Sequence, residues 1–180
     1  PFLFEPVLRT LAAAKLRASD AVAIEKPFGT DLASAQQLNE LIRIQLPKPT
    51  IFRIDHFLSD DLVRRVVTLR FLNRVFEPIW NSVHVERVDI SWLESLTLEG
   101  RAGYYDTAGA LRDMVQNHIL QLLCLVAMEP PASAAANDLR DEKLKVLKAL
   151  RPIMGDAVAQ LTVRGHYRAG ASDGGAVKGY

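Results

Sequence analysis

The chain has 180 residues, of which 49% are hydrophobic and 24% charged, a composition typical of a soluble globular protein that is long enough to bury a core. The formal net charge is +1 and the basic residues are dispersed, which excludes an extended basic surface for nucleic acid or a membrane. The longest apolar run, residues 119–128, is too short to cross a bilayer. We therefore expect neither a nucleic-acid nor a membrane partner.

Cysteine usage points to a reducing compartment. Cys124 is the single cysteine, so the chain cannot form an internal disulfide. Such usage is typical of cytoplasmic proteins, and we predict a cytoplasmic location. The sequence begins at Pro1 inside an apolar pattern of helical spacing and ends at Tyr180 without a closing element. We expect it to be an internal segment of a longer protein.

The first 54 residues alternate predicted helices and strands. They comprise a helix up to residue 17, a strand over residues 21–25, a helix capped by Thr30 or Asp31 and stopped by the prolines at 47 and 49, and a strand over residues 51–54. This alternation predicts part of an open parallel sheet, in which ligands bind beyond the carboxyl ends of the strands. Those ends carry Lys26, Asp55 and His56, so we look for chemistry there.

A different pattern follows. It comprises a helix over residues 60–76, a strand over residues 83–94, a long helix over residues 103–128, a charged helix over residues 138–150, a strand over residues 157–167 and a loop over residues 170–175. Residues 83–94 alternate apolar and polar side chains, as in a half-buried strand of an antiparallel sheet. We predict an α/β part over residues 1–54, followed by an α+β part with a mainly antiparallel sheet over residues 55–180.

The long predicted helix carries His118 on its apolar side, and Asp106 precedes the helical pattern as its expected cap. A buried imidazole needs a partner for each nitrogen, because an unpaired buried polar group costs about 1–3 kcal/mol. Two interpretations remain open from this stretch alone. His118 is either a core histidine bonded to a backbone carbonyl or a functional base.

The candidate residues make chemical sense as a set, although Lys26 alone could be a surface lysine and the Asp55–His56 pair a chance neighbour pair. Asp55 could orient His118 and stabilise the cation that forms when the imidazole takes up a proton. His56 and Lys26 would supply cationic contacts for an anionic substrate. Removing a hydroxyl proton in this way requires a hydride acceptor, which suggests nicotinamide chemistry.

Eight stretches of the sequence form an ordered set of motifs: residues 25–29, 53–58, 69–74, 78–81, 103–106, 112–118, 123–129 and 140–143. In their order and approximate spacing, over nearly the whole chain, they resemble the glucose-6-phosphate dehydrogenase family. The resemblance implies the C-terminal part of a Rossmann-like dinucleotide-binding domain over residues 1–54. The first part of the family's β+α substrate domain would follow over residues 55–180.

The resemblance also implies an activity. The family oxidises glucose 6-phosphate at C1 to the lactone, the reaction that opens the pentose phosphate pathway, with NADP or NAD as the hydride acceptor and without a metal. Its catalytic base falls on His118 and its orienting carboxylate on Asp55. We expect a homodimer or homotetramer of the complete protein.

The family's substrate contacts are carried over in the same way. Its phosphate-binding histidine falls on His56, and its lysine beside substrate and coenzyme falls on Lys26. Contacts to sugar hydroxyls fall on Glu94 and Asp113. The family's glycine-rich dinucleotide fingerprint lies outside this segment.

The sequence departs from the family pattern Asp-His-Tyr-Leu-Gly-Lys-Glu at two positions that matter. Phe57 lacks the tyrosine hydroxyl, and Asp60 replaces the substrate-binding lysine with the opposite charge. Either Asp60 caps the predicted helix and points away from the substrate, or the substrate carries no phosphate there. The alternatives to the family's activity are a divergent sugar or sugar-phosphate dehydrogenase and a non-catalytic regulatory homologue.

Overall fold

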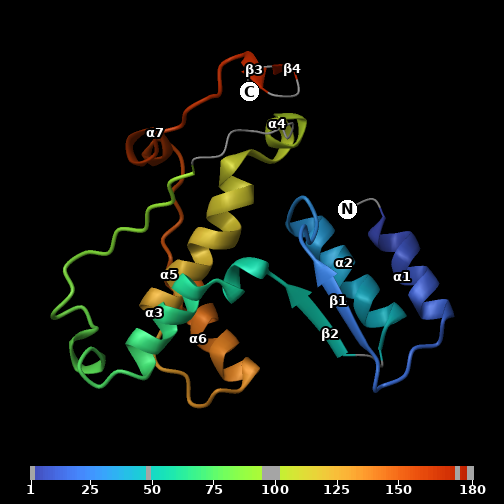
Figure 1. Ribbon diagram of the computed structural model, residues 1–180, viewed down its shortest axis with the longest axis horizontal. Helices are drawn as coiled ribbons and strands as arrows, with labels where there is room; N and C mark the ends of the chain where they lie inside the picture. The colour runs from blue at the N-terminus through green and yellow to red at the C-terminus, as the bar shows by residue number, and fades with distance from the viewer. Residues whose placement is uncertain (1–2, 48–49, 95–101, 173–174, 178–180) are drawn as a thin grey trace. The chain divides into compact units, whose positions relative to one another are not determined.

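The chain forms two compact units, Pro1–Ser59 and Asp60–Tyr180, in a computed structural model that describes residues 3–47, 50–94, 102–172 and 175–177. The first unit contains α1 (Phe4–Ala13), β1 (Ala21–Glu25), α2 (Leu32–Gln45), β2 (Thr50–Ile54) and the 3-10 helix η1 (His56–Ser59) (Figure 1). The order of helices and strands predicted for this part of the chain is therefore confirmed.

The second unit is mainly helical over its described residues. It contains α3 (Asp61–Phe71), the 3-10 helix η2 (Glu77–Ile79), α4 (Ala102–Ala110), the π-helix η3 (Leu111–Ile119), α5 (Leu120–Ala127), α6 (Ala136–Ala149), α7 (Ala157–Leu161), β3 (Gly170–Ser172) and β4 (Gly175–Val177). Within it, α5 packs against both α3 and α6 (Figure 1). No helix in the described part of the chain combines the length and the apolar character needed to cross a membrane.

The two strands of the first unit pair in parallel, as Figure 1 shows by their arrowheads. Their register joins Ala21 to Thr50 at one end and Glu25 to Ile54 at the other. Because both strands end at the same edge, the next residues of each strand, Lys26 and Asp55, emerge side by side. The parallel register therefore brings together two residues that are far apart in the sequence.

Helix α2 begins where its capping residues predict. The Asp31 carboxylate accepts a hydrogen bond from the Ser34 backbone N–H at 2.8 Å, and the Ser34 hydroxyl accepts one from the Asp31 N–H at 3.1 Å. This reciprocal pair is a capping box, which satisfies two N–H groups that the helix itself leaves unpaired. The start of α2 is thereby held at one position.

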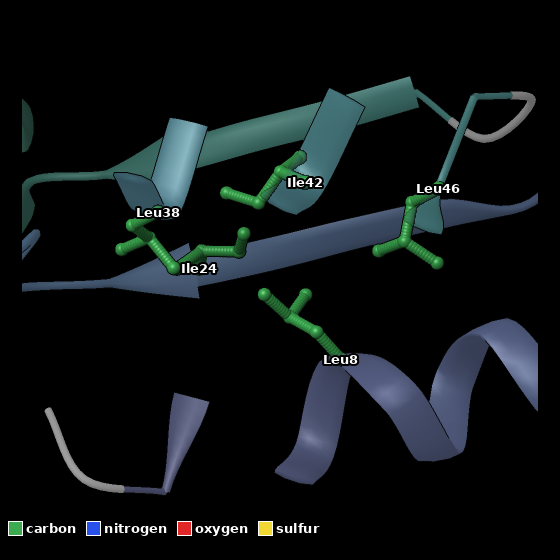
Figure 2. Packing of buried hydrophobic residues seen from close by; sticks show 5 residues of the cluster. All are labelled: Leu8, Ile24, Leu38, Ile42 and Leu46. Atoms are coloured by element: carbon green, nitrogen blue, oxygen red, sulfur yellow. The ribbon is translucent and has the colours of Figure 1, made fainter. Parts of the chain in front are cut away.

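One apolar cluster forms the core of the first unit. It consists of Leu8 from α1, Ile24 from β1, and Leu38, Ile42 and Leu46 from α2 and its end (Figure 2). Each of these side chains is at most 9% exposed. Residues four apart on α2 lie on one face of the helix, which explains how the predicted apolar spacing covers the sheet.

The start of α3 confirms the predicted role of Asp60, whose carboxylate accepts a hydrogen bond from the Leu62 N–H at 2.8 Å. The predicted end at residue 76 is wrong, because the helix ends at Phe71. The Asn73 side chain accepts a hydrogen bond from the Val75 N–H at 3.0 Å, a local turn that competes with the helical pattern.

The long helix predicted over residues 103–128 is interrupted. Gly109 has φ 66° and ψ 165°, a conformation that only glycine adopts at low cost, and it kinks the chain inside α4, one residue before that helix ends. The chain then continues as a π-helix into α5, with the Leu120 N–H bonded to the Val115 carbonyl. Asp106 lies within α4, so the prediction that it caps the long helix is wrong.

Two predicted strands are absent from the described residues. Residues 83–94 pair with no other described segment, and α7 replaces the start of the strand expected over residues 157–167. A strand needs a neighbour for its N–H and C=O groups, and alternating hydrophobicity alone does not supply one. The loop expected over residues 170–175 instead contains β3, which pairs antiparallel with β4.

A buried arginine binds the end of α5. Arg70 is 6% exposed, and its two terminal nitrogens donate to the carbonyls of Leu125 at 2.6 Å and Met128 at 2.8 Å. The Trp80 indole N–H donates to the Val126 carbonyl at 2.9 Å. Burial lowers the pKa of Arg70, but the guanidinium remains charged because its pKa starts so high. It therefore supplies charge-assisted bonds to carbonyls that a helix end leaves unpaired.

We predict that Arg70→Met lowers the free energy of unfolding of the second unit by about 2–3 kcal/mol, because charge-assisted bonds to buried carbonyls are lost. Chemical denaturation of the complete protein measures the change. Arg65→Met on the same helix is the matched control, since Arg65 is exposed and its replacement should change the unfolding free energy by less than about 0.5 kcal/mol. Equal effects of the two substitutions would show that the carbonyl contacts do not stabilise α5.

Candidate functional site

The sheet edge of the first unit holds the first pair of candidate residues. The Lys26 ammonium lies 3.4 Å from the Asp55 carboxylate, and these side chains are 27% and 17% exposed. The same Asp55 oxygen accepts a hydrogen bond from the Phe57 N–H at 3.3 Å. Partial burial reduces solvent screening of the pair. Lys26 and Asp55 thus form a polar centre at the carboxyl ends of the parallel strands.

His56 follows Asp55, lies on η1 and contacts Glu25, which was not among the predicted site residues. Its Nε2 lies 3.1 Å from the Glu25 carboxylate, and both side chains are well exposed. An exposed pair of this kind contributes little to stability and can open for a ligand. A parallel pairing of the two predicted strands would have indicated this contact, because it aligns Glu25 with Ile54, two residues before His56.

Gly29 holds the loop after Lys26 against the start of α2. Its φ is +96°, and a β-carbon at this position would lie 2.7 Å from the Ala35 nitrogen and 2.8 Å from the Ser34 hydroxyl oxygen. Any side chain would therefore be strained both by its backbone conformation and by a backbone contact. Glycine permits the tight packing that places the loop bearing Lys26.

In the second unit, His118 lies half-buried on the π-helix η3. Its imidazole stacks on the Trp92 indole, with ring centroids 5.4 Å apart and planes 21° apart. Glu94, the predicted sugar contact, is exposed and follows Trp92 by two residues. The stack therefore joins the segment that carries Glu94 to the helix that carries His118.

The π-helix also changes the relation between His118 and Asp113. In an α-helix, residues five apart point about 140° away from each other. The five-residue hydrogen-bond spacing of a π-helix instead places such residues about one turn apart on the same side. Asp113 accepts a hydrogen bond from the Tyr104 hydroxyl at 3.1 Å. Tyr104 and Trp92 were not predicted as site residues, since neither contact follows from α-helical spacing.

The site residues predicted from the sequence fall into two groups. The first unit brings Lys26, Asp55 and His56 to one sheet edge, and the second carries His118, Asp113 and Glu94. The pairing of Asp55 with His118 stays a prediction. Among the described residues, no three His, Cys, Asp or Glu side chains lie close enough to hold a metal ion.

Comparison with known protein families assigns both parts of the chain. Residues 1–65 match the family model described as the glucose-6-phosphate dehydrogenase NAD binding domain, and residues 67–180 match the one described as the glucose-6-phosphate dehydrogenase C-terminal domain. An NAD binding domain followed by a second domain is the organisation of a nicotinamide-dependent dehydrogenase. The chain belongs to the glucose-6-phosphate dehydrogenase family.

Individual relatives agree with this assignment. The chain is 60% identical over 159 residues to glucose-6-phosphate 1-dehydrogenase of Rhizobium meliloti (strain 1021), a match that covers 88% of this chain and 32% of the relative. It is 50% identical over 181 residues to the Zymomonas mobilis protein of the same name, with 100% and 37% covered. The chain thus spans about a third of the length of these curated relatives.

Solved structures share the fold. A glucose-6-phosphate dehydrogenase in complex with its substrate glucose-6-phosphate matches with a TM-score of 0.76 and 40% identity, covering 86% of this chain and 32% of that chain. The glucose-6-phosphate 1-dehydrogenase from Mycobacterium avium matches with a TM-score of 0.72 and 44% identity, covering 83% and 34%. The predicted family, and the order of a dinucleotide-binding domain and a second domain, are confirmed.

We predict that Gly29→Ala destabilises the first unit by at least about 1–3 kcal/mol, the usual cost of one strained backbone position. Gly155→Ala is the matched control, because Gly155 also has positive φ, +57°, but no atom lies within 4 Å of its added β-carbon. Thermal unfolding of both variants separates the contact with Ala35 from backbone strain alone. If Gly29→Ala proves no more harmful than Gly155→Ala, the close approach of the loop to α2 is unimportant.

Proposed function

We propose that this chain is part of an enzyme that oxidises glucose 6-phosphate at C1 to 6-phosphogluconolactone, with NADP or NAD as the hydride acceptor. The observation that carries the proposal is the half-buried Lys26–Asp55 pair at the carboxyl ends of the parallel strands, in a chain of this family. Ligands of open α/β sheets bind at that edge. The reaction is the one named for the chain's relatives.

His118 is the general base of the proposed reaction. It takes the proton of the C1 hydroxyl while the C1–H bond breaks and its electron pair leaves as hydride, so that a carbonyl forms at C1. Asp55 holds the imidazole in the required tautomer and stabilises the imidazolium. A carboxylate offers two oxygens and about four acceptor positions, so Asp55 can accept from His118 while keeping Lys26 and the Phe57 N–H.

Four residues contact the sugar phosphate in this proposal. His56 binds the phosphate. Its exposed contact with Glu25 breaks when the phosphate binds. Lys26 lies beside the substrate and the coenzyme, while Glu94 and Asp113 accept hydrogen bonds from sugar hydroxyls. The Tyr104–Asp113 contact supports the role of Asp113, because its carboxylate already accepts a hydrogen bond from a hydroxyl group there.

Lys26 is the residue of this chain that we propose to contact the coenzyme. Bound NADP, or NAD, supplies the carbon that accepts the hydride. Lys26 follows the carboxyl end of β1, where its ammonium, 27% exposed, can contact an anionic group while Asp55 balances its charge. We assign Lys26 to coenzyme as well as substrate binding, and we place no further part of the coenzyme site in this chain.

The same proposal covers the organisation of the complete protein. Residues 1–54 form the C-terminal part of the Rossmann-like coenzyme domain. Residues 55–180 form the first part of a β+α domain, and its mainly antiparallel sheet includes residues that the longer relatives have and this chain does not. We propose a cytoplasmic homodimer or homotetramer acting in the pentose phosphate pathway. The single buried cysteine supports the reducing location.

The helix cap at Asp60 bears on the choice of substrate. Its carboxylate binds the Leu62 N–H, so the acidic residue at the family's lysine position has a structural role at the start of α3. A sugar phosphate therefore remains the preferred substrate over an uncharged sugar. Coenzyme reduction by the complete protein with a panel of sugars and sugar phosphates separates this proposal from a divergent dehydrogenase and from a non-catalytic homologue.

We predict that His118→Asn in the complete protein lowers kcat about 10²–10⁴-fold with a smaller change in KM, because asparagine keeps some hydrogen bonding but cannot act as the base. Steady-state reduction of NADP measures both constants. The matched control is His84→Asn, since His84 is an exposed histidine of the same unit whose Nδ1 lies 2.9 Å from Asn81. Full turnover by the His118 variant would overturn its assignment as the base.

His56→Asn should act mainly on KM for glucose 6-phosphate, which we expect to rise about tenfold or more because a charge-assisted phosphate contact is worth about 1.5–3 kcal/mol. The same steady-state assay measures it, with free glucose as the comparison substrate. KM for free glucose should change little. An equal rise for both sugars would place His56 away from the phosphate.

A further inference from the structure

The stacked pair of Trp92 and His118 is a contact that the proposed reaction does not yet use. Trp92 belongs to the segment before α4, and His118 to η3, so the contact joins two separate parts of the second unit. The Trp92 side chain remains partly exposed, at 38%. The indole therefore covers one face of the imidazole and is itself partly exposed to solvent.

The stack covers one face of the imidazole and leaves the ring edge, with its buried Nδ1, outside the contact. The planes are 21° apart, so the indole covers the face of the imidazole and not its edge. The lone pair and the N–H bonds of an imidazole lie in the ring plane. Stacking on the face therefore restricts rotation of the ring while both nitrogens keep their in-plane directions for hydrogen bonds.

The stack also favours one charge state. An aromatic face carries partial negative charge, and tryptophan is the side chain that attracts cations most strongly. The centroid separation of 5.4 Å is within the range of about 6 Å for such attraction. An imidazolium in this place is stabilised relative to the neutral imidazole. In the proposed reaction His118 becomes a cation when it takes up the proton of the substrate hydroxyl. The contact with Trp92 would stabilise that cation in this step.

We propose that Trp92 is a positioning residue for the base: its indole face fixes the plane of the His118 imidazole and stabilises the imidazolium formed when the substrate hydroxyl loses its proton. The inference rests on the proposed function for the role of His118 and adds a residue to it. The observed contact of Trp92 is with the base, so the role that we propose for it acts through His118.

Several charged groups lie on the elements that carry the pair. Asp113 and Arg112 belong to η3, Glu94 follows Trp92, and Lys143 of α6 donates to Gln121 at 2.8 Å just after η3. Asp55 is the carboxylate proposed to orient the imidazole. None of these charged groups is altered by the replacement of Trp92, so the parent protein and a Trp92 variant differ in sequence only by the indole.

The test compares the pH dependence of kcat/KM for glucose 6-phosphate in the complete protein with that of Trp92→Leu and Trp92→Phe. A general base must be neutral to act, so the acidic limb of the profile reports the imidazole. Loss of the indole should move this limb to lower pH by about 0.4–0.7 units, and Trp92→Phe should restore part of the shift. We expect kcat to fall more than KM rises in Trp92→Leu, because ring orientation is lost.

Trp80→Phe is the matched control. It removes the other tryptophan of the unit, whose N–H binds the Val126 carbonyl, and should leave the acidic limb unmoved even if the protein becomes less stable. An acidic limb that stays in place in Trp92→Leu overturns the inference. Titration of a ¹³C-labelled His118 imidazole in the same variants provides a readout without turnover. An inactive parent protein would overturn the proposed function, while the imidazole titration would still decide the role of Trp92.

Discussion

The parallel pairing of β1 and β2 is the constraint on which the first half of the candidate site depends. Its register aligns Glu25 with Ile54, and the next residues of the two strands, Lys26 and Asp55, form the half-buried ion pair. A shift of one residue would turn the side chains of one strand to the opposite face and separate the pair. The apolar core below, with Ile24 in its centre, prevents that shift because a slipped strand would expose its buried side chain.

The second half of the site depends on a departure from regular helical geometry. Gly109 kinks the chain near the end of α4, and the chain then winds as a π-helix through Asp113 and His118. The wider spacing places these two residues on the same side, with Trp92 stacked on the imidazole. Arg70 holds the far end of the continuing helix α5 by its carbonyls. The π-helix that carries His118 thus lies between the kink at Gly109 and the part of α5 that Arg70 binds.

The sequence predicted what local chemistry and short-range spacing determine. Capping by Asp31 and Asp60 was predictable because a carboxylate before an apolar pattern has a definite partner, and the strand ends followed from apolar runs bounded by breakers. The π-helix was not predictable, because apolar spacing over nine residues does not distinguish it from an α-helix. The prediction of a strand at residues 83–94 was wrong for another reason. Alternating apolar and polar side chains indicate one buried face, but a strand also needs a hydrogen-bonded neighbouring strand, which the described residues do not provide.

We propose that Asp55 orients His118 toward the sugar, although the two residues belong to different units. The most direct test of this proposal is a crystal structure of the complete protein with glucose 6-phosphate bound. We expect an Asp55 carboxylate oxygen within about 2.6–3.2 Å of one His118 nitrogen and the C1 hydroxyl within the same range of the other. A structure in which the His118 ring faces neither Asp55 nor C1 of the sugar would contradict it.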